Sequence, residues 1–167
     1  MRFFAFLLVF SVQPWSTQAQ SAVTKQKFIC NTGYTLQQCR REMTALRPIL
    51  EKFHADALGE WSWILVRSED WGPLMLRLRE NPDSPALTSL EDKATFFDEA
   101  LVAPLPARRA ELFKIWQVPI DQLLDEAVTH EIGHSLCNDL DEARAEHRAH
   151  ALRRGEQPTC DNKKNRS

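Results

Sequence analysis

The sequence predicts a single α+β domain, in which one helix comes first, a few strands follow and helices end the chain. Apolar side chains recur every three or four residues over residues 35–58, which is typical of a helix. Residues 61–67 are instead rich in aromatic and β-branched side chains, which favour a strand. From Pro106 onward the helical period returns. We place the folded core at about residues 35–154, with a polar tail over 158–167.

The length and composition narrow the class of protein. A chain of 167 residues fits one domain, and a hydrophobic content of 43% suffices for a packed core. The formal charge is −2 and the basic residues are scattered, so nothing indicates nucleic acid as a partner. We expect a monomer without stable membrane insertion.

The first 19 residues have the composition of a secretory signal peptide. Arg2 supplies a positive charge, residues 3–10 are nearly all apolar, and a small-residue exit follows at Thr17-Gln18-Ala19. We expect cleavage after Ala19, with Ala22 as the second choice, and export of residues 20–167 to the periplasm or the medium. The apolar run is shorter than the roughly 20 residues that a transmembrane helix needs. The alternative is a cytosolic protein with an apolar N-terminus.

Export to an oxidising compartment predicts that the four cysteines form two disulfides. Three pairings are possible. We favour the one that joins nearest neighbours along the chain, Cys30 with Cys39 and Cys137 with Cys160. A cysteine–zinc cluster is the weaker alternative, because the spacing lacks the close Cys-x-x-Cys pairs of structural zinc sites.

The first predicted helix covers residues 35–58. Thr35 and Gln38 have the spacing of a capping box, and Gly59 is a suitable stop. Pro48 falls inside the apolar pattern without shifting its phase. We therefore expect one helix, kinked at Pro48, rather than two.

The middle of the chain predicts a small sheet. After the strand at 61–67, which has apolar side chains on both faces, residues 70–73 favour a turn. Residues 74–78 alternate between apolar and basic side chains and predict a second strand. A loop over 81–85 and a short third strand at 95–98 follow.

Helical segments then continue to the end of the core. They are separated by Pro119 and by a break at residues 138–141. The segments cover residues 107–116, a helix capped by Asp121 that runs to about Leu136, and residues 142–154.

Residues 130–134 of the second of these helices have the sequence His-Glu-Ile-Gly-His. His130 and His134 lie one turn apart on one helix face, where two neutral imidazoles can bind one zinc ion. Glu131 is turned about 100° away and can reach a zinc-bound water, whose pKa the metal lowers to about 7. Gly133 is costly inside a helix, which indicates close packing or room at the metal face. The alternative is a solvated helix face with surface histidines.

A catalytic zinc site needs a third protein ligand and an open fourth position. The metzincin pattern would require Gly and His at the positions of Cys137 and Leu140, so that class is excluded. Glu142 is the better candidate, because seven residues separate it from His134, enough for a turn and a returning helix. The alternative is that Glu142 completes a capping box begun by Asp139.

The motif at 130–134, with Glu142 and with Glu146 four residues later, resembles the gluzincin metallopeptidases, especially the compact minigluzincin type. Those proteins have a backing helix, a small twisted sheet, a metal helix and a glutamate helix, the order predicted above. The resemblance implies that His130, His134 and Glu142 bind Zn²⁺. It further implies that Glu131 is the general base and acid and that Glu146 orients a zinc-binding histidine.

Many gluzincins stabilise the tetrahedral intermediate with a tyrosine or histidine, and Tyr34 is the single tyrosine of this chain. The resemblance therefore makes His147 and His150 candidates for that role, with Arg153 as a third. The alternative is that these two histidines are ordinary exposed residues of a helix.

Together these features predict a secreted zinc-dependent metallopeptidase that hydrolyses peptide bonds of a peptide or protein substrate. An extended substrate would pair with an exposed strand edge near the metal helix, for which residues 95–98 are the closest candidate in sequence. The alternatives are a non-catalytic secreted zinc-binding protein and a structural or interaction domain stabilised by its disulfides.

Overall fold

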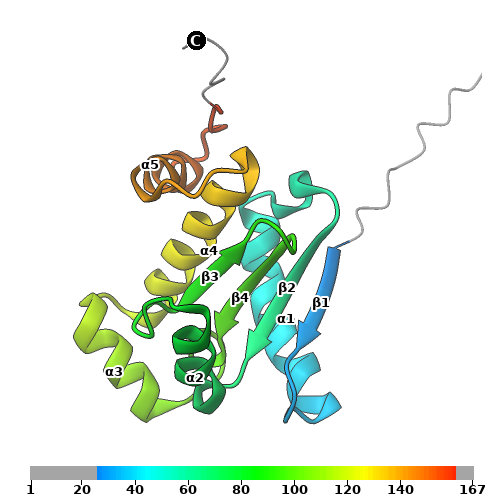
Figure 1. Ribbon diagram of the computed structural model, residues 1–167, viewed down its shortest axis with the longest axis vertical. Coiled ribbons are helices and arrows are strands. Elements are labelled where there is room, and N and C mark those ends of the chain that lie inside the picture. Colours follow the sequence, from blue (N-terminus) through cyan, green and yellow to red (C-terminus); the bar gives the residue numbers. More distant parts are fainter. Residues whose placement is uncertain (1–25, 161–167) are drawn as a thin grey trace, which may run out of the picture.

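The computed structural model describes residues 26–160, and within them five α-helices surround a four-stranded mixed sheet (Figure 1). The predicted α+β class is therefore confirmed. The expected signal peptide, residues 1–19, and the end of the polar tail, residues 161–167, lie outside the described part of the chain.

The elements follow one another in this order: β1 (Gln26–Cys30), α1 (Leu36–Lys52), a 3₁₀ turn (Ala55–Leu58), β2 (Trp61–Val66), α2 (Ser68–Leu78), β3 (Ala86–Ser89), β4 (Ala94–Asp98), a second 3₁₀ turn (Glu99–Leu101), α3 (Pro106–Trp116), α4 (Ile120–Cys137) and α5 (Glu142–Arg153).

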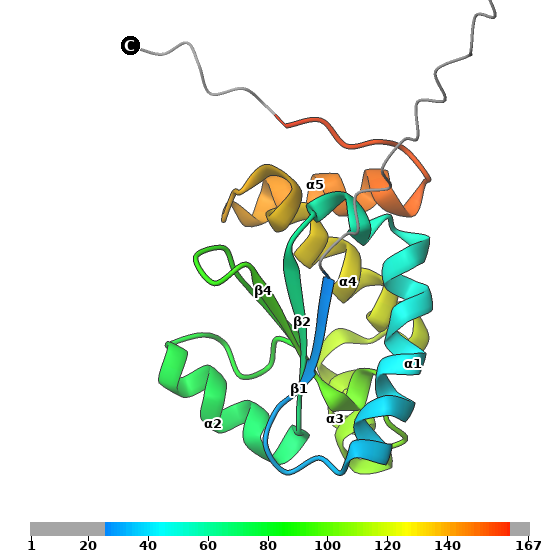
Figure 2. The same ribbon diagram turned by 90° about the vertical axis from the view of Figure 1, so that its right-hand side faces the viewer.

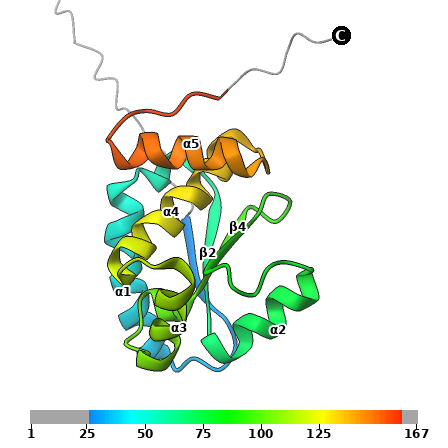
Figure 3. The same ribbon diagram turned by 90° about the vertical axis from the view of Figure 1, so that its left-hand side faces the viewer.

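The sheet has the strand order β1-β2-β4-β3. Strands β1, β2 and β4 are parallel, whereas β3 is antiparallel to β4 and forms one edge. Helices α1, α3 and α4 cover one face and α2 covers the other, and α5 lies across one end of α4 (Figures 2 and 3). Both faces of β2 are therefore buried, with Trp63 in the larger core and Val66 in the smaller core under α2, as the sequence predicted.

The first helix begins as predicted and ends early. Thr35 and Gln38 form the expected capping box, with backbone-to-side-chain hydrogen bonds of 3.0 and 3.2 Å, and Pro48 lies inside α1. The helix ends at Lys52 because His54 adopts a left-handed backbone with φ of 55°, and a separate 3₁₀ turn covers Ala55–Leu58. The single helix to residue 58 was therefore a wrong prediction.

The predicted turn at 70–73 and strand at 74–78 are also wrong, because both segments belong to helix α2. Trp71 and Met75, one helical turn apart, are buried against the sheet, while Leu76 is 68% exposed. Burial of these two large side chains outweighs the cost of Pro73 inside the helix. The alternation of apolar and basic side chains around Leu76 is typical of a strand, but here it lies on the solvent side of a helix.

The remaining elements agree with the sequence, except for two short strands that it did not predict. The predicted loop over 81–85 and the strand at 95–98 are confirmed, whereas β1 and β3 were missed. The three C-terminal helices are confirmed within a few residues, although Pro119 and not Asp121 holds the N-cap position of α4.

Two disulfides link neighbouring elements in the favoured pairing. Cys30–Cys39 joins β1 to α1, and Cys137–Cys160 joins the end of α4 to the segment after α5. Within residues 26–160, no helix combines the length and apolar character required to cross a bilayer.

Candidate metal centre

The histidines of helix α4 point toward one side of the helix because its opposite side is buried in the core. Val128 and Ile132, four residues apart, are fully buried. His130 and His134 follow each of them by two residues and therefore point to the other side of the helix. Asn138 ends α4 with a left-handed backbone, and the chain turns back into α5.

Helix α5 begins at Glu142. Asp141 caps it, because its carboxylate accepts a 3.0 Å hydrogen bond from the backbone N–H of Arg144. Glu142 is thus the first residue of the helix and does not complete a capping box begun by Asp139, which excludes that alternative. Its side chain is free to turn toward α4, where it is 78% exposed.

Close packing explains Gly133. A Cβ atom at this position would lie 2.5 Å from the backbone oxygen of Ala145, so only glycine permits the observed crossing of α4 and α5. Ala145 and Ala149 of α5 are fully buried at this crossing side. The contact sets how far Glu142 and Glu146 lie from the histidines of α4.

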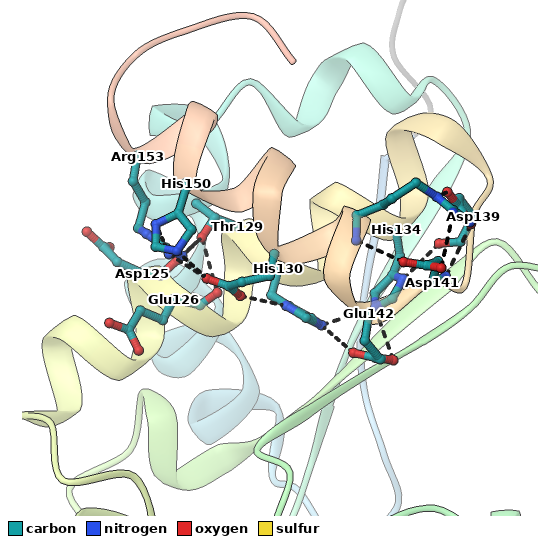
Figure 4. A network of polar contacts seen from close by, with 12 residues as sticks. Asp125, Glu126, Thr129, His130, His134, Asp139, Asp141, Glu142, His150 and Arg153 are labelled. Carbon is teal, nitrogen blue, oxygen red and sulfur yellow. Dashed lines mark hydrogen bonds and ion pairs between the residues drawn. The ribbon is translucent and has the colours of Figure 1, made fainter. Parts of the chain in front are cut away.

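Three side chains converge between the two helices (Figure 4). His130 Nε2 lies 3.1 Å from His134 Nε2 and 3.0 Å from Glu142 Oε2, and His134 Nε2 lies 3.6 Å from Glu142 Oε1. Three ligands about 2.0–2.2 Å from a tetrahedral zinc ion would be roughly 3.3–3.5 Å apart. The observed separations therefore fit one metal ion bound by all three groups.

The other ring nitrogens favour the same arrangement. His130 Nδ1 lies 3.0 Å from Glu146 Oε2, and His134 Nδ1 lies 2.8 Å from the backbone oxygen of Asp139. Each Nδ1 faces an acceptor and therefore carries the proton in a neutral ring, so both Nε2 lone pairs point to one place. Two lone pairs that meet beside a carboxylate make a donor set for a divalent cation.

The surrounding charges stabilise positive charge at this place. Burial lowers the pKa of His130, but the carboxylates of Glu146, Glu131 and Glu142 outweigh it and raise the pKa above its ordinary value. Within residues 26–160, the two imidazoles are the only basic groups that pair with Glu142. Two imidazoles and one carboxylate are the ligand type of hydrolytic zinc sites.

The Glu146 carboxylate oxygen that does not face His130, Oε1, contacts Arg153 and His150. Arg153 donates to Glu146 Oε1 at 2.9 Å and to the Thr129 hydroxyl at 2.8 Å, and His150 lies 3.1 Å from the same carboxylate. Burial raises the pKa of Glu146, but His130 and Arg153 outweigh it and lower the pKa. His150 and Arg153 therefore support Glu146. Neither residue lines the cleft beside the candidate metal ligands, and exposed His147 does not line it either.

Asp139, whose backbone oxygen accepts from His134, is itself held by two arginines that the sequence analysis did not single out. The Asp139 carboxylate accepts hydrogen bonds from Arg144 at 2.7 Å and from Arg148 at 3.0 Å, and these cations hold its pKa well below the usual range. Arg148 is 4% exposed and also donates to the backbone oxygen of Gly133 at 3.1 Å. The three residues form the Asp139 clamp. A spacing of four residues between two arginines on α5 was its only signal in the sequence.

Glu131 is buried beside the candidate metal ligands and lines the cleft. Burial raises the pKa of its carboxyl group, while the Thr88 hydroxyl and the two histidines oppose the rise. Thr88 belongs to β3 and shares a 3.0 Å hydrogen bond with Thr95 of β4. The Thr88 hydroxyl also lies 3.5 Å from the backbone oxygen of Glu131, so the edge of the sheet lies against the centre of α4.

The cleft has a volume of about 630 Å³ and contains His130, His134, Glu131 and Glu142. Its other wall is the segment from Ser84 to Thr88, which includes most of β3. Strand 95–98, expected from the sequence to be the exposed edge, is instead an interior strand that pairs on both sides. The edge next to the candidate metal ligands is β3, which the sequence did not reveal.

Comparisons of the chain with family models, with curated proteins and with solved structures found no match. The residues and geometry of this chain therefore carry the functional inference.

Proposed function

We propose that this protein is a secreted zinc-dependent metallopeptidase. The observation that carries the proposal is the convergence of His130, His134 and Glu142 on one point, beside buried Glu131 and in a cleft along a strand edge. The three ligand atoms lie within 4.8 Å of one another, and all three residues line the cleft.

Zinc at this place would polarise a peptide carbonyl and acidify a water molecule. Glu131 would take one proton from the attacking water as its oxygen bonds to the carbonyl carbon. The same carboxyl group would then give that proton to the leaving amine nitrogen as the carbon–nitrogen bond breaks. Glu146 and the Asp139 clamp would hold the two imidazoles in the tautomer that presents Nε2 to the metal.

Strand β3 offers a binding mode for an extended peptide. It is an edge strand, so one row of its backbone N–H and C=O groups has no partner in the sheet. A substrate that adds to this edge would run along the cleft and pass the metal ligands. The two disulfides support export to an oxidising compartment.

The test begins with metal content. Residues 20–167, produced in an oxidising compartment and supplied with zinc, should bind about one zinc ion per chain. Glu142→Ala should weaken binding without unfolding the protein, because Glu142 is largely exposed and starts the helix. His134→Ala should abolish binding, but its ring is buried, so its circular dichroism spectrum must be compared with that of the wild type.

Activity separates a peptidase from a zinc-binding protein without catalysis. Wild-type protein should cleave members of an unbiased peptide mixture, and Glu131→Gln should bind zinc but lose cleavage. Zinc binding without cleavage in the wild type would refute the peptidase proposal and favour the non-catalytic alternative. Folded protein that binds no zinc would refute both and favour the structural domain.

A further inference from the structure

The cleft continues beyond the metal ligands along α4. Leu123, Glu126 and Ala127 line it and precede His130 by seven, four and three residues, so they share its helix face. Met75 of α2 and Trp116 of α3 line the same cleft. We call these five residues the α4 arm of the cleft. Apart from Glu126, each of them offers an apolar surface.

The charge of the cleft lining is strongly one-sided. Five glutamates line it, and neither lysine nor arginine does. Glu131, Glu142 and Glu146 belong to the metal centre, where the histidines and the metal balance their charge. The other two, Glu80 and Glu126, form no ion pair with any residue of the described chain, 26–160.

Glu126 is placed to act on a bound ligand. One of its carboxylate oxygens accepts a 3.0 Å hydrogen bond from the Gln122 amide, and no other side chain within 26–160 bonds to the carboxylate. Figure 4 shows this carboxylate outside the network around His130 and His150. A partly buried carboxylate without a cation, one turn from a metal ligand, favours a cationic partner from outside.

A side chain that joins a long apolar stem to a cationic head matches the α4 arm. Leu123 and Ala127, on the same face of α4 as Glu126, line the cleft with apolar side chains against which the methylene groups can pack. The exposed ring of Trp116 offers a face on which a guanidinium or ammonium group can stack, and Glu126 can accept its hydrogen bonds. An acidic side chain would instead meet uncompensated negative charge.

We propose that the α4 arm selects peptides that carry a lysine or arginine side chain next to the scissile bond. The proposal rests on the peptidase function above and names its substrate class. Selection comes from the uncompensated Glu126 carboxylate above an apolar wall.

Binding to a protein that does not cleave tests this directly. Zinc-loaded Glu131→Gln is titrated into fluorescent short peptides that are identical except for one residue, which is lysine, norleucine or glutamate, moved through every position. At one position the lysine peptide should bind about tenfold tighter than the norleucine peptide, and the glutamate peptide should bind more weakly than both.

A second pair of variants assigns the preference to Glu126. Glu126→Gln, made in the same background, should reduce the lysine preference to about twofold or less. Asp125→Asn is the matched control: it removes the same charge from the neighbouring residue, which pairs with Lys52 and does not line the cleft. The control should keep the full preference. Equal binding of the three peptides, or an equal loss in both variants, would overturn the proposal.

The same peptides distinguish this inference from the peptidase function. Wild-type cleavage without a basic preference would overturn the selectivity and leave the peptidase function intact. A lysine preference that depends on Glu126 in a protein that cleaves nothing would support the selectivity of the α4 arm and refute the peptidase function.

Discussion

The crossing of α4 and α5 at Gly133 gives the sharpest test of how the candidate metal ligands are positioned. In Gly133→Ala the new Cβ would lie 2.5 Å from the backbone oxygen of Ala145 and 3.2 Å from its carbonyl carbon. These atoms are backbone, so no side chain can rotate away. The helices must separate by several tenths of an ångström, and Glu142 must move with α5.

The expected change in the free energy of unfolding of Gly133→Ala follows from two opposing effects. Overpacking of a well-packed contact costs about 1–3 kcal/mol, and a backbone clash belongs near the upper end. The higher helix propensity of alanine returns about 1 kcal/mol. We therefore expect Gly133→Ala to lower the free energy of unfolding by about 2 kcal/mol. Zinc affinity should fall about 10- to 100-fold, as it does when the support of a ligand is disturbed.

The chain contains a matched control. Gly72 also lies inside a helix, α2, but a Cβ there would meet nothing within 4 Å apart from its neighbours in the chain. Gly72→Ala should change the free energy of unfolding by less than about 1 kcal/mol, because Pro73 restricts the preceding residue and offsets the helix propensity of alanine, and it should leave zinc affinity unchanged. Urea unfolding and competition with a chromophoric chelator measure both quantities. The reasoning is refuted if Gly133→Ala is as stable as the wild type and binds zinc equally well.

Three further predictions concern other parts of the structure. Arg148→Met should weaken zinc binding and alter the visible absorption of the cobalt-substituted protein, because Asp139 loses a buried partner; Arg148→Lys should partly restore both. Burial raises the pKa of Glu42, so the wild type should lose stability as the pH rises from about 4.5 toward the raised pKa. Glu42→Gln should not lose stability over this pH range. The urea midpoints of the wild type and the variant should therefore differ only at neutral pH, and a difference of equal size at acidic and at neutral pH would contradict this. Replacing Cys137 and Cys160 by serine opens a bridge between residues 23 apart and should cost about 3 kcal/mol in urea unfolding, and no loss would show that α5 holds without it.

The metal ligand candidates could be predicted from the sequence because their arrangement is local. His130 and His134 share a helix face through a spacing of four residues, and a short turn brings the start of the next helix back to them. The capping box at Thr35 was equally local and was confirmed, because a few neighbouring residues contain all its geometry. The favoured disulfide pairing was also confirmed, between cysteines 9 and 23 residues apart.

Other features were decided only by contacts between distant segments. Residues 74–78 alternate like a strand but form a helix, because Trp71 and Met75 bury themselves on the sheet. Strand β3 becomes the edge beside the cleft only because it pairs antiparallel with β4. No local pattern distinguishes an edge strand from an interior one, since that depends on which strands lie next to it.

The orientation of the histidines shows the same division. The sequence by itself determined the helix, the ligand types and their spacing. The resemblance already implied that Glu146 orients a histidine. Only the folded chain decided that this histidine is His130 and that the backbone oxygen of Asp139, whose carboxylate Arg148 holds, accepts from His134. These contacts depend on the distance between α4 and α5 where they cross at Gly133. That distance is set by packing between the two helices, so the apolar period of either helix cannot predict it.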